Sequence, residues 1–231
     1  AAGDDTVSGG TGADTIDVVG GANSVTGGAG DDSITGGSGA DYINGDADDD
    51  TIKGENGDDT LVGGAGADTI LGGTGADSIM GEAGADTVTS GAGNDYINLG
   101  AGADHVYVEA NLTSDDTIVG GADSDTLFLE SSVDLSSVGT NVTGIDAIEV
   151  NNGTAGANDD SDYTITVDDT FVGNSDSDSI TIDTVNNTAQ EFTVSAAVSS
   201  GYTVTVGGTE TAFTLANVDN RITLADVADT G

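Results

Sequence analysis

Aliphatic residues recur every nine positions along the first half of the chain, from Ala1 to about Tyr107. In a frame that starts one residue before Ala1, the eighth position of each nine-residue unit is aliphatic. These residues are Val7, Ile16, Val25, Ile34, Ile43, Ile52, Leu61, Ile70, Ile79, Val88, Ile97 and Val106. The three residues around each of them, such as Thr69-Ile70-Leu71, are too few for a helix and are rich in strand formers. The pattern predicts a series of short strands, each with its middle side chain pointing inward.

Polar positions repeat with the same period of nine. The sixth positions are Asp5, Asp14, Asn23, Asp32, Asp41, Asp50, Asp59, Asp68, Asp77, Asp86, Asp95 and Asp104. The first, second and fourth positions are mostly glycine, which adopts the backbone angles that a tight turn needs and other residues avoid. Such a turn brings several carbonyl oxygens towards one point, and the aspartate adds an anionic oxygen there. A unit repeated in this way is typical of a stacked, solenoid architecture.

Two units, about 18 residues, are expected to make one coil with a turn and a short strand on each side. Successive coils would stack at the usual strand spacing of about 4.8 Å. The fold class that follows is all-β: a right-handed parallel β-roll, or β-solenoid, with an aliphatic interior.

The repeat changes character after Tyr107. A three-residue insertion at 108–110 precedes two degenerate units, 111–119 and 120–128, which place Asp116 and Asp125 at the sixth position. We expect the β-roll to occupy residues 1–128.

Alternating apolar and polar residues replace the nine-residue unit beyond Phe128, as in Tyr163-Ile165-Val167 and Tyr202-Val204-Val206. This alternation predicts half-buried strands with one apolar face. We expect residues 129–231 to form an all-β cap or self-assembly domain. A small sandwich and a broadened continuation of the spiral are both compatible with the pattern.

The charge balance indicates that a cation is part of the fold. The chain has 42 acidic residues, two basic ones (Lys53 and Arg221) and a net charge of −40, which opposes compaction. Calcium suits the turns because it accepts about six to eight oxygen ligands in flexible geometry, whereas magnesium demands stricter octahedra. Zinc and copper are poor candidates, since the chain has no cysteine and a single histidine, His105.

Loops one coil apart should lie on the same edge of the roll. A metal ion is therefore expected between Asp59 and Asp77, and likewise between Asp68 and Asp86. Twelve such loops on two edges predict about ten calcium ions. The sites near Asn23 and Asp50 should be the weakest, because the first lacks a charge and the second has an over-acidic turn without its position-four glycine.

The unit follows the pattern G-G-x-G-x-D-x-U-x, where U is aliphatic, and residues 63–71 and 72–80 match every defined position. In this respect the first half of the chain resembles the RTX calcium-binding β-roll proteins. The resemblance implies that each ion takes Asp side chains from two loops together with several turn carbonyls. Residues 125–129, 133–136 and 144–150 resemble stretches that follow the repeats in bacterial S-layer and large surface RTX proteins.

The sequence gives no support for catalysis. It contains neither H-E-x-x-H nor G-x-S-x-G, so neither a zinc protease nor a nucleophile elbow can be built, and we expect the protein not to be an enzyme. Two basic residues cannot neutralise nucleic-acid phosphates. No apolar run is long enough for membrane insertion.

An extracellular location, at a bacterial cell surface, is expected because repeated low-affinity sites fill at about millimolar calcium. The absence of cysteine fits a secreted protein that is held by ions in place of disulfides.

Three functions are compatible with the sequence. Outward positions are mostly Thr or Ser, with apolar Val62 and Met80 on one face, which favours a self-assembling subunit of a surface layer, filament or matrix. The alternative is a calcium-dependent adhesion module that binds a cell-surface glycan, although the sequence shows only scattered tyrosines. Ice binding would need a regular row of turn threonines, and position three is Thr only at Thr11 and Thr74.

Overall fold

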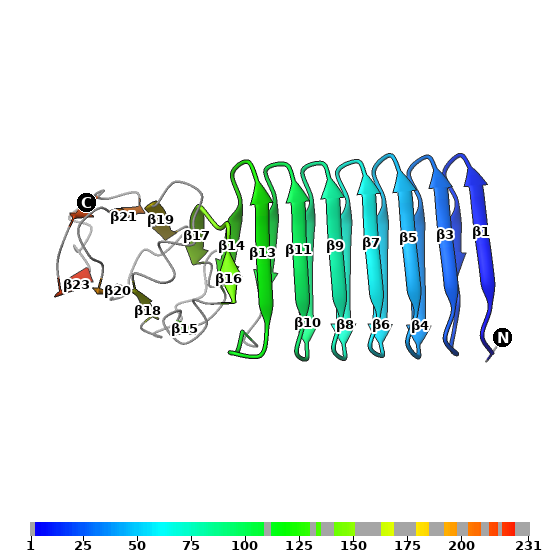
Figure 1. The fold of residues 1–231 in the computed structure, drawn as a ribbon, viewed down its shortest axis with the longest axis horizontal. Helices are drawn as coiled ribbons and strands as arrows, with labels where there is room; N and C mark the ends of the chain where they lie inside the picture. The colour runs from blue at the N-terminus through cyan, green and yellow to red at the C-terminus, as the bar shows by residue number, and fades with distance from the viewer. Residues whose placement is uncertain are drawn as a thin grey trace, which may run out of the picture.

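The computed structural model describes residues 3–108, 112–129, 133–134 and 141–150, together with strands at 163–168, 179–184, 192–197, 203–208, 213–216 and 219–224. These residues form an all-β parallel β-solenoid of about 7 turns (Figure 1). The prediction of the fold class is confirmed. No helix of the described residues is long and apolar enough to cross a membrane.

One strand from each coil contributes to the first sheet, which has eight strands. These are β1 (Thr6–Thr11), β3 (Ser24–Ala29), β5 (Tyr42–Ala47), β7 (Thr60–Ala65), β9 (Ser78–Ala83), β11 (Tyr96–Ala101), β13 (Thr117–Ala122) and β16 (Val142–Thr143). Most strands span six residues where the repeat alone indicated three, because the glycines of the following unit continue the pairing into the turn.

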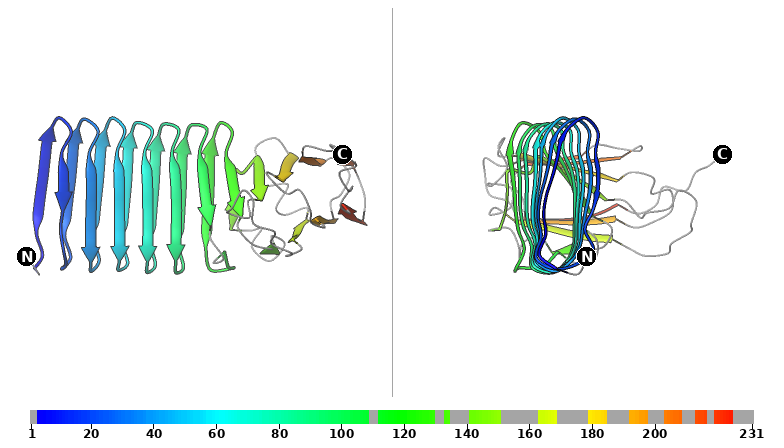
Figure 2. Two further views of the ribbon diagram at one scale, coloured as in Figure 1. Left: turned by 180° about the vertical axis from the view of Figure 1, so that it is seen from behind. Right: turned by 90° about the vertical axis from the view of Figure 1, so that its right-hand side faces the viewer.

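The second sheet has eleven strands. Each coil of the roll contributes its other strand to this sheet. In pairing order these are β2 (Thr15–Asp17), β4 (Ser33–Ser38), β6 (Thr51–Asn56), β8 (Thr69–Thr74), β10 (Thr87–Ala92), β12 (His105–Val108), β14 (Thr126–Leu129), β17 (Ala147–Val150), β19 (Ser179–Thr184), β21 (Thr203–Gly208) and β22 (Phe213–Ala216). Seen along the roll, the coils overlap as one flattened loop with the two sheets on its long sides (Figure 2).

The two sheets pair in parallel with a constant register. Ile52 of β6 lies beside Ile70 of β8, and Leu61 of β7 lies beside Ile79 of β9. The fixed register follows from the fixed period, since every coil brings the same unit position to the same place. Identical positions therefore form straight rows along the roll.

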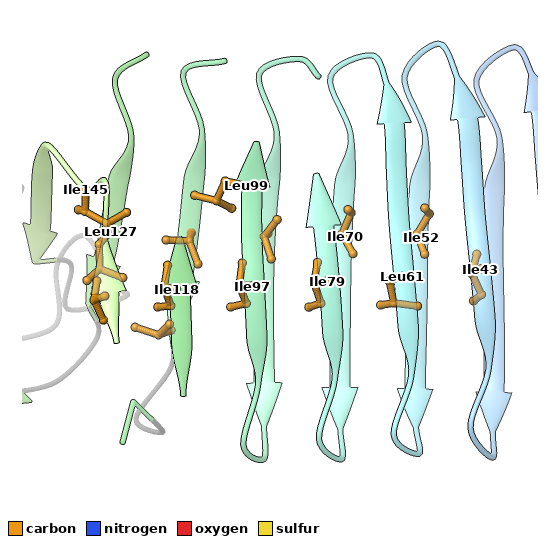
Figure 3. Close-up of a cluster of buried hydrophobic side chains, with 14 of the residues drawn as sticks. Ile43, Ile52, Leu61, Ile70, Ile79, Ile97, Leu99, Ile118, Leu127 and Ile145 are labelled. Carbon is orange, nitrogen blue, oxygen red and sulfur yellow. The ribbon is translucent and has the colours of Figure 1, made fainter. Parts of the chain in front are cut away.

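The core is a double row of the eighth-position aliphatic side chains, which point into the space between the two sheets (Figure 3). The residues from Val25 to Val106 in this row are buried, and Val7 and Ile16 at the amino-terminal end are partly buried. The inward orientation expected from the sequence is confirmed for all of these. The core is only one or two aliphatic side chains wide, so hydrophobic burial per coil is small.

The coils lengthen beyond β12. Tyr96 of β11 pairs with Thr117 of β13 across the predicted insertion, and Ile118 pairs with Val142 across a still longer connection. Further along, Ile148 of β17 pairs with Ile182 of β19. The roll therefore keeps its parallel pairing while its coils grow.

A third sheet of four strands accompanies this widened part: β15 (Val133–Asp134), β18 (Tyr163–Asp168), β20 (Phe192–Ala197) and β23 (Asp219–Leu224). Only the last pairings, β20 with β23 and β21 with β22, are antiparallel in the described part of the chain. The sheet that contains β14 runs on in parallel through β17, β19 and β21. The division after Phe128 and the choice between a sandwich and a broadened spiral stay predictions.

Candidate metal centres at the turns

The turns that lead from the first sheet to the second line one edge of the roll, at the top of Figure 1. We call it the upper edge. Its sixth-position residues are Asp14, Asp32, Asp50, Asp68, Asp86, Asp104 and Asp125. The backbone N–H of each donates to Oδ1 of the next one along, for example from Asp50 to Asp68 at 2.8 Å and from Asp68 to Asp86 at 2.8 Å. These carboxylates therefore form a continuous ladder.

The turns that lead from the second sheet back to the first line the lower edge, at the bottom of Figure 1. Its ladder consists of Asp5, Asn23, Asp41, Asp59, Asp77, Asp95 and Asp116. The N–H of Asp59 donates to Oδ1 of Asp77 at 2.9 Å. The three-residue insertion leaves both ladders unbroken, since Asp95 donates to Asp116 at 2.8 Å and Asp104 to Asp125 at 3.0 Å across 21 residues in place of 18. The structure thus places every candidate ligand in one of two rows.

The second carboxylate oxygen, Oδ2, is buried along most of both ladders. It accepts no hydrogen bond at Asp14, Asp32, Asp41, Asp50, Asp59, Asp68, Asp77, Asp86 and Asp104. A buried carboxylate oxygen without a donor is costly, and a row of them is costlier, because the charges repel one another. A bound cation removes both penalties.

The position-one glycines pack closely against these oxygens and leave no room for a Cβ. A Cβ added to Gly45 would lie 2.2 Å from Oδ2 of Asp50 and 2.6 Å from the carbonyl oxygen of Gly63. At Gly63 the corresponding distances are 2.4 Å to Oδ2 of Asp68 and 2.9 Å to the carbonyl oxygen of Gly81. A carboxylate oxygen and a backbone carbonyl of the next coil therefore converge on each glycine, which explains why a side chain is disfavoured there.

Burial perturbs the ionisation of the ladder. Desolvation raises the pKa of Asp50, Asp77 and Asp86 to about 6, partly opposed by the backbone N–H that each accepts and reinforced by neighbouring carboxylates. Burial likewise raises the pKa of Asp59, Asp68, Asp95 and Asp104. A raised carboxyl pKa means that the charged form lacks compensation from the protein itself.

The donor set fits calcium. The described residues contain no group of three or more His, Cys, Asp or Glu side chains that could hold a metal by themselves. Any ion at the turns therefore takes carboxylates from neighbouring coils and completes its shell with backbone carbonyls. All of these donors are hard oxygens in a variable arrangement, which calcium accepts and zinc or copper does not favour.

The turn that the sequence marked as irregular keeps the common geometry. Asp48 occupies the position-four glycine site with φ 77°, and Asp46 of the same turn also has φ 77°. Asp50 still donates to Asp68 and accepts from Asp32, and its Oδ2 lacks a donor like the others. The turn tolerates Asp because this residue enters the left-handed region more readily than most.

Sequence reasoning missed an aromatic cluster on the outer face of the second sheet. The rings of Tyr107 and Phe128 stack with centroids 4.4 Å apart, and His105 meets the Phe128 ring edge-on at 5.2 Å. The signal was present in the chain, since Phe128 becomes the neighbour of Tyr107 once the three-residue insertion is counted. The cluster contains a single tyrosine, so counting tyrosines along the sequence did not reveal it.

The comparisons with known proteins agree with this geometry. A family model described as the RTX calcium-binding nonapeptide repeat matches residues 1–34, 17–52, 35–70, 44–79, 71–106 and 112–135. A search of curated proteins returns no match to the chain. The family matches cover more than half of the sequence and coincide with the two ladders. The chain belongs to the RTX calcium-binding repeat family, and its repeats form a calcium-binding β-roll.

Proposed function

We propose that the protein is an extracellular structural element of a bacterial surface layer, filament or matrix, in which calcium holds the coils of the roll together. The observation that carries the proposal is the pair of aspartate ladders with buried Oδ2 atoms that accept no hydrogen bond. Such rows oppose folding in a metal-free chain and support it when a cation joins neighbouring turns. The ligands would be the sixth-position residues, and about ten ions would follow from the number of turns.

The narrow core supports the same role. Each coil buries about two aliphatic side chains, a gain of about 3–6 kcal/mol. Fixing 18 residues costs several times more in backbone entropy, at about 1–2 kcal/mol per residue. Ion binding has to supply part of the difference, so the roll would be rigid where calcium is abundant and unfolded where it is scarce. That dependence suits a protein that works outside the cell.

The outer face of the first sheet supports self-association. Its outward positions seven and nine from β1 to β13 carry no charged residue, although the chain as a whole is strongly acidic. Tyr42 and Tyr96 are each 45% exposed there, and Val62 and Met80 lie between them, partly buried. The exposed charges of these strands, Asp46 of β5 and Glu82 of β9, lie nearer the upper edge, so positions seven and nine form an uncharged strip on which a second copy of the chain can pack.

The ion-binding part of the proposal is tested by calcium titration of an Asp77→Asn variant. Asp77 lies between Asp59 and Asp95 in the ladder, so loss of its charge should weaken the ions on both sides and raise the calcium midpoint of folding. Asp58→Asn is the matched control, because Asp58 is exposed and its Oδ1 accepts from the Ala76 N–H outside the ladder. Equal midpoints for wild type and Asp77→Asn would contradict the assignment.

The assembly part is tested by size-exclusion chromatography and electron microscopy with calcium and with EGTA. We expect oligomers or filaments in calcium and their loss in the Tyr42→Glu/Tyr96→Glu variant. Thr51→Glu/Thr87→Glu, on the outer face of the second sheet, is the control. A protein that stays monomeric at high concentration with calcium bound would refute self-association.

Glycan binding is the second candidate, favoured by the aromatic cluster of His105, Tyr107 and Phe128. Aromatic rings stack on the apolar faces of sugars, and His105 is exposed while Tyr107 is half-buried. Phe128 is only 8% exposed, so it would support Tyr107 rather than contact a sugar. A glycan array with wild type and Tyr107→Ala tests this role, and equal binding by both would exclude the cluster.

A further inference from the structure

Asn23 satisfies its turn without an ion. Its side chain is 3% exposed and stands in the lower-edge ladder where the neighbouring coils have aspartates. Its Nδ2 donates to Oδ1 of Asp41 at 2.8 Å and to the carbonyl oxygen of Gly21 at 3.2 Å. Its Oδ1 accepts from the Asp5 N–H at 3.0 Å. The amide thus joins the carboxylate of the next coil to a carbonyl of its own turn, which is the task assigned to a cation elsewhere.

The residue at position one of this turn also differs. Val18 is buried and belongs to the core cluster, whereas the next lower-edge turn has Gly36 in this place. A Cβ on Gly36 would lie 2.6 Å from Oδ2 of Asp41 and 3.0 Å from the carbonyl oxygen of Gly54. Val18 adds an apolar side chain to the core at a position where the next turn has no room for a Cβ. The turn thus differs from its neighbours at two positions, and the amide of Asn23 is the one that occupies the place of a charged ligand.

The other end of the lower edge is satisfied by different donors. Oδ2 of Asp116 accepts from the backbone N–H of Thr113 at 2.7 Å and from its hydroxyl at 3.2 Å. Oδ1 of Asp116 accepts from the Asp95 N–H at 2.8 Å. Both carboxylate oxygens therefore have protein donors, in contrast to those of Asp59 and Asp77, whose Oδ2 atoms accept none.

The upper edge keeps a carboxylate at every sixth position from Asp14 to Asp104, and the buried Leu99 at position one of the Asp104 unit leaves Oδ2 of Asp104 without a donor. Every Oδ2 in that stretch lacks a hydrogen-bond donor, and each sixth position is a carboxylate. The two edges of the roll are therefore chemically unequal, although the repeat is the same.

We infer that the lower edge is closed at both ends by the protein's own donors, at Asn23 and Asp116, and takes calcium only between Asp41 and Asp95, while the upper edge loads from Asp14 to Asp104. The inference rests on the proposed calcium sites and deepens them. It implies fewer bound ions than the turn count suggests. It also implies that the amino-terminal coils on the lower edge stay joined at calcium concentrations too low to fill the remaining turns.

The test exchanges the features of the two edges in the full chain. Asn23→Asp with Val18→Gly should raise calcium bound at saturation by about one or two ions per chain, and Asp50→Asn on the upper edge should lower it by about one or two, because each ladder position borders two turns. Asn98→Asp, on the outer face of the first sheet, is the matched control and should change nothing. Equilibrium dialysis with atomic emission gives the stoichiometry, and circular dichroism in saturating calcium shows that each variant folds.

A crystal structure of the unaltered chain in calcium decides the matter without any variant. We expect anomalous density between Asp41 and Asp59 and none bonded to Asn23 or Asp116. An ion ligated by either residue would overturn the inference, as would a folded Asn23→Asp/Val18→Gly protein that binds no more calcium than wild type. A wild-type chain that binds no calcium at all would instead refute the proposed function.

Discussion

The repeat region and the widened carboxyl-terminal region use the same parallel pairing but differ in the regularity of their coils. Up to β12 every coil has 18 residues, and the backbone N–H of each sixth-position residue donates to the carboxylate of the next turn at distances near 2.8 Å. Beyond β14 the coils differ in length, as the pairs Ile148 with Ile182 and Ile180 with Val204 show. No aspartate ladder continues among the described residues there.

The difference shows what the constant period is for. An ion between two turns needs both carboxylates side by side, which the 18-residue period provides in every coil, and the 21-residue coils still keep Asp95 beside Asp116 and Asp104 beside Asp125. All four phenylalanines of the chain lie at or beyond Phe128.

Removal of calcium should produce the largest difference in stability between the two regions. When free calcium is at about 100 times the dissociation constant of a site, binding at that site adds about 2.7 kcal/mol to the free energy of unfolding. Several such sites together reach the usual stability of a whole domain, about 5–15 kcal/mol. We expect amides of residues 3–108 to lose hydrogen-exchange protection in EGTA, and those of β17, β19 and β21 to lose less. Exchange followed by mass spectrometry measures this. Protection of the repeats that survives exhaustive chelation would contradict a role for ions in holding the roll.

Truncation of the core row should have the next largest effect. Ile70 is fully buried between the sheets, so Ile70→Ala should lower the free energy of unfolding in calcium by about 2–5 kcal/mol. Leu71→Ala is the control, because Leu71 is 37% exposed on the outer face and should change stability little. Denaturant unfolding in saturating calcium gives both values. Similar losses for the two variants would mean that the narrow core contributes little beyond the ions.

A methyl group at a position-one glycine should act on the ladder directly. Gly45→Ala places a Cβ 2.2 Å from Oδ2 of Asp50, so the carboxylate has to move, and we expect a loss of about 1–3 kcal/mol together with weaker calcium binding. Gly3→Ala is the control, since nothing lies within 4 Å of its added Cβ. Thermal unfolding at fixed calcium compares the two. A stable Gly45→Ala protein with unchanged calcium affinity would show that the glycine is not needed beside the ion.

Acidification should have the smallest effect on each calcium site. The pKa of Asp50, Asp77 and Asp86 is raised to about 6 from 3.8, so without calcium these groups oppose folding above pH 6 and cease to do so as the pH falls below it. Protons then compete with calcium, and affinity should drop about tenfold for each such carboxylate one pH unit below its pKa. Calcium titrations at pH 7.5 and pH 5 measure the shift. A midpoint independent of pH would show that these carboxylates are not ligands.

The repeat made much of the fold predictable from the chain alone. The inward row of aliphatic residues, the two strands per coil and the meeting of Asp59 with Asp77 all follow from a period of nine, because a regular sequence allows one regular stack. The three-residue insertion was also readable, and Asp116 and Asp125 stand in the ladders where the shifted frame puts them.

Tertiary structure decided what depends on contacts between coils of different sequence. The amide of Asn23 binds Asp41, Thr113 binds Asp116, and the Tyr107 ring stacks on Phe128, and none of these contacts was expected from the repeat unit. The sequence by itself determined which positions recur, since the period alone sets which side chains face the core and which face the turn. Whether a given turn needs an ion is set by the donors that the adjacent coil brings within hydrogen-bond distance, and these appear only once the coils are stacked.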